Sequence, residues 1–200
     1  MKYCTITPMI PFNRLGLLFK LFSPLVYPWK TIDDLSGLLK GIEPGSLVLD
    51  IGAGTGILTQ FAHKIRNDLK YVALDPAQGM IQYAPEYAYK VRAVAESLPF
   101  KKSIFSVVLI GDTIHHIDNP HKAIMEIKGC MTPTGRLFIF DLNPDTFMGR
   151  IICRMERLFK EPANFYSPET LSEMLTGYGF RTKISRYDWR YSVMAELIDS

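Results

Sequence analysis

Cysteine is scarce in this sequence, and the few that occur form no recognisable pattern. Cys4, Cys130 and Cys153 are the only three in 200 residues, and they stand far apart, with no C-x-x-C pair and no zinc-ligand spacing. A disulfide framework usually shows an even set of cysteines, and a structural zinc site needs paired ligands. We therefore expect reduced thiols in a cytoplasmic protein, and no metal site.

Strong charge of one sign and long apolar runs are missing as well. The net charge is +3 and no lysine- or arginine-rich run appears, which argues against a nucleic-acid partner. Lys20 and Pro24 interrupt the apolar N-terminal stretch, so it fits neither a signal peptide nor a transmembrane helix. A chain of 200 residues with 48% hydrophobic residues is long enough for one α/β domain with its own core.

The two common phosphate-binding loops are also missing, and a different glycine loop stands in their place. Neither G-x-G-x-x-G nor a glycine-lysine loop occurs, but the apolar run from Leu47 passes through Asp50 into three alternate glycines ending at Gly56. Glycines let the backbone turn sharply and let a ligand lie against it. A carboxylate there repels phosphate and attracts an ammonium group. The pattern predicts a nucleotide-type loop for a cationic ligand, or else a tight turn that binds nothing.

The stretch Asp50-Ile51-Gly52-Ala53-Gly54-Thr55-Gly56 resembles the first motif, (D/E)-x-G-x-G-x-G, of the class I S-adenosylmethionine (SAM) methyltransferases. The resemblance covers about residues 31–198, near the ubiquinone/menaquinone-biosynthesis-like branch. It implies SAM as the cofactor, S-adenosylhomocysteine as the product, and a Rossmann-like α/β fold. That fold has a seven-stranded, mostly parallel sheet, an antiparallel C-terminal hairpin and helices on both faces. Strands that alternate with helices over residues 31–180 also predict a parallel sheet.

The resemblance extends to the residues expected around the cofactor. Asp75 ends a second apolar strand about twenty residues after the glycines, where an acid can accept hydrogen bonds from ribose hydroxyls, although it could also cap a helix. Glu96 could instead be a solvated loop acid, and Met80 an ordinary core residue. The predicted cofactor-binding residues are Asp50, Gly52, Ala53, Gly54, Gly56, Asp75, Pro76, Met80, Ala95, Glu96, Ser97 and Asp112.

The substrate side of the predicted site follows the apolar strand 104–110. The run His115-His116-Ile117-Asp118-Asn119-Pro120 resembles an HH-apolar-x-(D/N)-P pattern of the family. Imidazole titrates near neutral pH, so either histidine could remove a proton from the acceptor, or both could be structural. These two histidines are the catalytic candidates. Asp141 and Asn143, at the end of the strand expected over 136–144, and Tyr166 are weaker substrate-side candidates.

Several local signals mark where helices begin and end. Thr31 and Asp34 suggest a capping-box-like helix start, and Asn119 before Pro120 a second one. Ser167 before Pro168 predicts a third helix, which glycines at 177 and 179 should close. The segments 180–187 and 191–197 read as the final two strands.

Two segments lie outside the expected cofactor-binding core. Residues 1–30 form an apolar cap segment ahead of the domain at 31–200, and a lid-like insertion is expected at about 144–166. Within it the apolar residues fall on one helical face, flanked by basic ones: Phe147, Met148, Ile151, Ile152, Met155, Leu158 and Phe159, beside Arg150, Arg154, Arg157 and Lys160. Such a stripe suits a lid over a hydrophobic acceptor, a peripheral contact with anionic lipid through 1–30 and 147–160, or a helix simply packed on the core.

These features together predict a cytoplasmic enzyme, peripheral at the inner membrane surface if the lipid contact exists. It would transfer a methyl group from SAM to a small hydrophobic, lipid- or quinone-like acceptor. Alternatives are methylation of a soluble small metabolite and a SAM-binding module without turnover. An NAD(P)-dependent dehydrogenase is disfavoured by Asp50 and by the glycine spacing. The sequence leaves the oligomeric state open.

Overall fold

The computed structural model describes residues 27–158 and 164–198, and the side chains of 156–158 lie outside that description. Its strands are β1 (Leu47–Ile51), β2 (Lys70–Leu74), β3 (Tyr89–Val91), β4 (Phe105–Gly111), β5 (Met131–Leu142), β6 (Phe180–Tyr187) and β7 (Arg190–Leu197). Its helices are α2 (Trp29–Leu39), α3 (Ile57–Ile65), α4 (Gln78–Ile81), the 3-10 turn η2 (Ile114–His116), α5 (Pro120–Cys130), α6 (Phe147–Leu158) and α7 (Pro168–Gly177).

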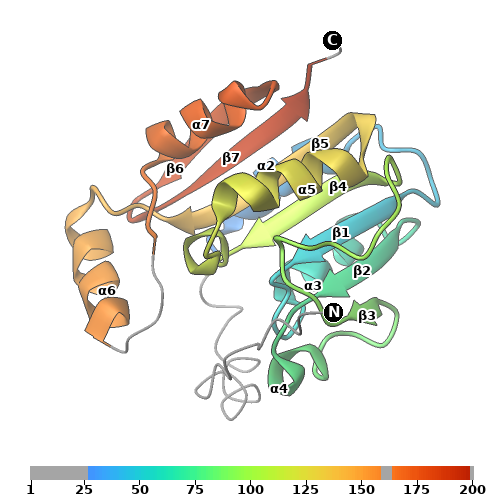
Figure 1. The fold of residues 1–200 in the computed structure, drawn as a ribbon, viewed down its shortest axis with the longest axis horizontal. Coiled ribbons are helices and arrows are strands. Elements are labelled where there is room, and N and C mark those ends of the chain that lie inside the picture. Colours follow the sequence, from blue (N-terminus) through green and yellow to red (C-terminus); the bar gives the residue numbers. More distant parts are fainter. Residues whose placement is uncertain (1–26, 159–163, 199–200) are drawn as a thin grey trace.

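All seven strands form one sheet in the order β3-β2-β1-β4-β5-β7-β6. The strands from β3 to β5 pair in parallel, whereas β7 runs antiparallel to both β5 and β6 (Figure 1). The seven-stranded, mostly parallel sheet with a C-terminal antiparallel hairpin is therefore confirmed. The fifth strand is longer than expected, because it begins at Met131 and runs through an irregular pairing with β4 before Arg136.

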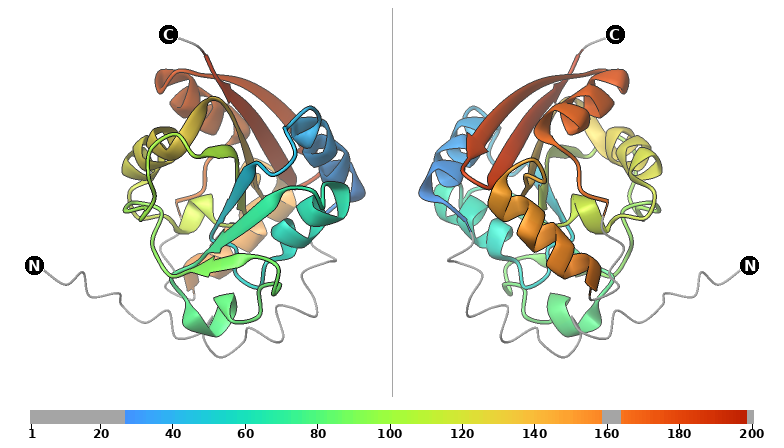
Figure 2. Two further views of the ribbon diagram at one scale, coloured as in Figure 1. Left: turned by 90° about the vertical axis from the view of Figure 1, so that its right-hand side faces the viewer. Right: turned by 90° about the vertical axis from the view of Figure 1, so that its left-hand side faces the viewer.

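Helices cover both faces of the sheet, and each face has its own hydrophobic core (Figure 2). Successive residues of a strand point to opposite faces, so Val108 and Ile110 face α5 and α7 while Val107 and Leu109 face α2 and α3. Buried on both sides, β1, β4 and the second half of β5 read as nearly continuous apolar runs in the sequence. This sandwich gives the rigid frame on which the strand ends present polar residues.

Most of the predicted helix boundaries are confirmed, but the first is wrong. Asn119 and Ser167 each accept a hydrogen bond from a backbone N–H three residues on, as N-caps do. The capping box at Thr31 and Asp34 does not exist, because α2 begins two residues earlier, at Trp29, after Pro28. Thr31 is buried inside the helix, and Asp34 accepts hydrogen bonds from the distant Tyr187 and Ser192 hydroxyls instead.

The parallel strands bring the predicted site residues to one edge of the sheet. Asp50, Asp75, Asp112 and Asp141 stand at or just beyond the carboxyl ends of β1, β2, β4 and β5, which are neighbours in the sheet. Ligands of open α/β sheets bind at this edge. Among the described residues, no helix is long and apolar enough to cross a membrane.

Candidate functional site

The glycine loop between β1 and α3 has a backbone that other residues would adopt only with strain. Gly52, Gly54 and Gly56 have φ values of 65°, 53° and 78°, in the left-handed region that favours glycine. A Cβ on Gly52 would overlap the Thr113 side chain, whose hydroxyl donates a hydrogen bond to the Gly52 carbonyl. The spacing of the three glycines is therefore a requirement of this loop, whichever ligand it holds.

Asp75 ties the glycine loop to the end of β2. Its carboxylate accepts hydrogen bonds from the Gly54 N–H and the Ala77 N–H, both at 2.8 Å. The Ala53 N–H donates to the Leu74 carbonyl at 3.0 Å and closes the same junction. Burial raises the pKa of Asp75, and the two N–H groups oppose that rise. The carboxylate thus belongs to the wall of the loop.

Asp50 is turned toward α3. Its Oδ2 accepts hydrogen bonds from the Thr59 N–H (3.0 Å) and the Thr59 hydroxyl (2.6 Å), and the residue is 1% exposed. Burial raises the pKa of Asp50 to about 7; the Thr59 bonds lower it and the nearby Asp75 charge raises it. The carboxylate fixes the start of α3 and keeps a negative potential beneath the loop when it is ionised.

The remaining cofactor candidates lie around this junction to different degrees. The Met80 methyl lies 3.3 Å from where a Cβ on Gly54 would be, so Met80 packs against the loop. Glu96 lies farther along the edge, where it accepts a hydrogen bond from the Asn119 N–H at 3.2 Å. Ala95 is buried, Pro76 is half-buried and Ser97 is exposed.

Asp112 follows β4 and forms an ion pair with Arg190 at the start of β7. Asp112 has a φ of 48°, which is uncommon for a residue other than glycine. Burial raises its pKa, and the Arg190 charge opposes the rise. The guanidinium of Arg190 also lies against the rings of Phe140 and Trp189, at 5.1 Å and 4.4 Å from their centroids.

The structure joins two candidates that the sequence left separate. The His115 ring donates from Nδ1 to the Asp141 carboxylate, at 2.7 Å and 2.9 Å from its two oxygens, and both side chains are 2% exposed. The Leu142 N–H donates to the same carboxylate at 2.6 Å. Phe165 stacks on the His115 ring with centroids 4.7 Å apart. The pair is thus oriented by β5 and covered by the segment that leads into α7.

The other substrate-side candidates border this pair. His116 is half-buried, with its ring centroid 4.0 Å from that of His115. Asn143 is buried, and its side-chain carbonyl accepts a hydrogen bond from the Asp145 N–H. The carbonyl of the half-buried Tyr166 accepts a hydrogen bond from the Tyr191 hydroxyl at 2.9 Å. His116 is therefore the more accessible of the two histidines.

The helix expected in the lid-like insertion is α6, which stands to one side of the sheet (Figure 1). Phe147, Met148, Ile151 and Met155 are exposed, whereas Cys153 is buried. Residues 159–163 of the insertion, residues 1–26 of the cap segment, and the side chains of 156–158 lie outside the described part of the chain.

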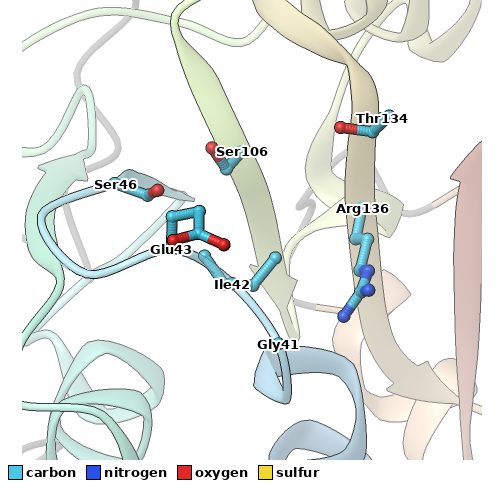
Figure 3. A pocket seen from close by; sticks show the side chains of 7 residues that line it. All are labelled: Gly41, Ile42, Glu43, Ser46, Ser106, Thr134 and Arg136. Carbon is cyan, nitrogen blue, oxygen red and sulfur yellow. The ribbon is translucent and has the colours of Figure 1, made fainter.

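A separate hollow of about 150 Å³ lies at the opposite edge of the sheet (Figure 3). Glu43 and Ser46 line it from the segment before β1, with Ser106 of β4 and Arg136 of β5. Arg136 uses its guanidinium to bond the carbonyls of Leu38 and Lys40. None of the predicted site residues lines this hollow.

Sequence reasoning missed three residues that organise the site. Thr59 holds Asp50, Thr113 holds Gly52, and Arg190 holds Asp112. Thr59 and Thr113 follow motif residues closely, so their proximity to the loop was a usable signal. Arg190, the first residue of β7, is 78 residues from Asp112 in the chain, and only the antiparallel insertion of β7 brings it to this edge.

Comparison with known proteins agrees with this geometry. Residues 49–139 match the family model "Methyltransferase domain". The chain is 32% identical over 146 residues to the uncharacterized protein MJ1123 of Methanocaldococcus jannaschii, covering 72% of this chain and 68% of that protein.

A second relative and a solved structure extend the likeness. Over 185 residues the chain is 28% identical to the ubiquinone/menaquinone biosynthesis C-methyltransferase UbiE of Vibrio parahaemolyticus, covering 76% of this chain and 70% of that one. The crystal structure of a SAM-dependent methyltransferase from Thermotoga maritima superposes with a TM-score of 0.71 at 20% identity, covering 94% of this chain and 98% of that one.

Proposed function

The chain belongs to the class I SAM-dependent methyltransferase family, and on this premise we propose that it methylates a small hydrophobic acceptor of lipid or quinone type. SAM is the cofactor and S-adenosylhomocysteine the product that goes with this family. The observation that carries the acceptor class is the exposed apolar face of α6, beside the edge of the sheet where the site residues lie. The name of the UbiE relative, a quinone-pathway C-methyltransferase, agrees with it.

We assign the donor to the edge formed by β1, β2 and β4. The bare backbone of the glycine loop allows the adenosyl group to lie close, and Asp75 at the end of β2 would accept from the ribose hydroxyls. Met80 and Ala95 would line the adenine, with Glu96, Ser97 and Pro76 at its rim. Ligand binding would then exchange the Gly54–Asp75 bond for bonds to the sugar.

Methyl transfer asks for alignment more than for acid–base chemistry. An electron pair of the acceptor attacks the methyl carbon, the carbon–sulfur bond breaks, and its electrons remain on sulfur as a neutral thioether. Where the attacking atom carries a proton, that proton must pass to a base. His116 is our candidate base because it is the more exposed histidine, and His115 with Asp141 would hold it from beneath.

The outer face of α6 supports a hydrophobic acceptor. Phe147, Ile151 and Met155 recur at intervals of four and are 72%, 37% and 53% exposed. Arg150 and Arg154, also exposed, lie beside them on the helix. An apolar stripe with a cationic border fits an anionic lipid surface, and α6 would cover an acceptor drawn from that surface.

The direct test is transfer from methyl-labelled SAM. The full chain would be incubated with a demethylated isoprenoid quinol in mixed micelles, and separately with a panel of water-soluble amines, phenols and thiols. We expect label in the quinol fraction, and His116→Ala should lower turnover while S-adenosylhomocysteine affinity stays within about twofold, since the histidine acts on the acceptor.

The alternatives are separate outcomes of the same assay. If label appears only in a water-soluble product, the acceptor is a soluble metabolite and not a lipid or quinone. Tight binding of SAM with no transfer to any acceptor would favour a binding module. No sedimentation with anionic phosphatidylglycerol vesicles would remove the proposed contact at the inner membrane surface.

A further inference from the structure

Arg190, the first residue of β7, is a buried cation at the carboxyl-end edge of the sheet. In the β5–β7 register it stands opposite Leu142, at the carboxyl end of β5, and its side chain is only 8% exposed. The rings of Phe140 and Trp189 lie against its guanidinium. Its Nη1 donates to Asp112, while its Nε is buried without a hydrogen-bond partner among the described residues. The fold has thus placed an arginine, at a desolvation cost, at the edge that binds ligands.

The two members of the ion pair differ in solvent exposure, and the more exposed one faces the candidate site. The Asp112 side chain is 28% exposed, against 8% for Arg190, so the acid is the accessible member of the pair. Asp112 also has a left-handed backbone, a conformation that costs energy and that is concentrated at functional sites. The accessible carboxylate and its left-handed backbone both lie at the carboxyl-end edge of the sheet.

Asp112 lies next to the part of the loop that faces β4. The following residue, Thr113, donates its hydroxyl to the Gly52 carbonyl at 3.1 Å, and the Asp112 N–H bonds the Phe140 carbonyl at 2.8 Å. A nucleoside held on this loop, with its ribose toward β2, would direct its 5′ substituent toward β4. In SAM that substituent ends in an amino acid, whose α-ammonium needs an anionic acceptor.

We propose that Arg190 is a positioning residue of the donor site, holding the Asp112 carboxylate where it binds the α-ammonium of SAM. The proposal rests on the function proposed above and adds a residue from the C-terminal hairpin to it. Burial raises the pKa of Asp112, and the charge of Arg190 is the largest influence that opposes this rise. Without Arg190 the carboxylate would be less often ionised and free to turn away.

The experiment compares two probes that differ in the amino-acid end. S-adenosylhomocysteine carries the α-ammonium, and 5′-methylthioadenosine has the same nucleoside and sulfur without it. Both would be titrated calorimetrically into the full chain and into Asp112→Asn, Arg190→Gln and the double variant. Arg186→Gln is the matched control, since Arg186 is an exposed arginine of the same hairpin that pairs with Glu169.

We expect Asp112→Asn and Arg190→Gln each to weaken the binding of S-adenosylhomocysteine by about tenfold or more, which is the usual effect of losing a charge-assisted hydrogen bond. Binding of 5′-methylthioadenosine should stay within about twofold in both. Because Arg190 works through Asp112, the double variant should bind no more weakly than Asp112→Asn alone. The Arg186→Gln control should bind both probes as the parent chain does.

Equal loss of both probes in Arg190→Gln would assign the arginine to the fold alone, and unchanged S-adenosylhomocysteine binding in Asp112→Asn would overturn the proposal. If Arg190→Gln does not fold, Asp112→Asn still decides whether the carboxylate binds the ammonium, and Arg190→Lys, which keeps the charge, decides whether the cation supports it. Failure of the parent chain to bind either probe would instead overturn the proposed function.

Discussion

Replacing Asp50 by asparagine should stabilise the cofactor-free protein at neutral pH. The pKa of Asp50 is raised by burial to about 7, from an ordinary value of 3.8. Between those two values the folded chain holds a proton that the unfolded chain has released. The free energy of unfolding therefore falls as pH rises from about 4 to about 7, and stays low above that. At about 1.36 kcal/mol per pH unit, the loss is on the order of 4 kcal/mol.

Asparagine cannot ionise, so Asp50→Asn should lack this loss. Its side-chain carbonyl can still accept a hydrogen bond from Thr59, which preserves the start of α3. The measurement is urea unfolding of both proteins from pH 4.5 to pH 8 without cofactor. The stability of the variant relative to the parent should increase steadily toward pH 7 and then level off.

The matched control is Asp68→Asn. Asp68 is exposed and its pKa is lowered by the hydrogen bond from Arg66, so its protonation does not change in this pH range. Its stability difference from the parent chain should be flat. An equally flat profile for Asp50→Asn, or a variant less stable than the parent at pH 8, would contradict a raised pKa at Asp50. Because the Asp50 carboxylate would attract the positive charge of the cofactor, the stabilised variant should bind SAM more weakly.

Three further predictions concern other parts of the molecule. Gly52→Ala should lower the free energy of unfolding by about 2 kcal/mol or more, whereas Gly129→Ala, in open space on α5, should raise it by about 0.5–1 kcal/mol, both by urea titration. His115→Ala should lower the free energy of unfolding by about 3–5 kcal/mol, because it leaves the Asp141 carboxylate buried without the imidazole. A decrease below about 1 kcal/mol in urea titration would contradict the pairing. Phe147→Glu should reduce sedimentation with anionic vesicles without changing the thermal midpoint; equal sedimentation of both proteins would argue against α6 as the contact.

The parts of the fold that could be predicted are those in which one short segment carries the whole signal. The buried strand before Asp50, the three glycines and the Asn119-Pro120 helix start each contain their own reason for forming. The antiparallel C-terminal pair also followed from the family resemblance. The start of α2 did not, because Asp34 looks like a capping residue until Tyr187 and Ser192 are placed beside it.

The candidate site also combines features that local sequence predicts with features that depend on distant residues. Gly54 and Asp75, both expected at the cofactor, are in direct contact. The pairing of His115 with Asp141 and of Asp112 with Arg190 joins residues 26 and 78 positions apart in the chain. Such pairs depend on which strands are neighbours and which face each residue takes, and no local pattern encodes either.

The place of β7 in the sheet has a consequence for synthesis on the ribosome. β7 follows β6 in the chain, yet it lies between β5 and β6. A nascent chain that has not yet released β7 therefore carries β5 with an open, apolar edge, a surface that invites pairing with other chains and that chaperones recognise. Arg190 is the first residue of β7, so the corner at Asp112 is also completed last. Once β7 has been translated it can pair with β5 and cover the edge that makes the intermediate prone to aggregation.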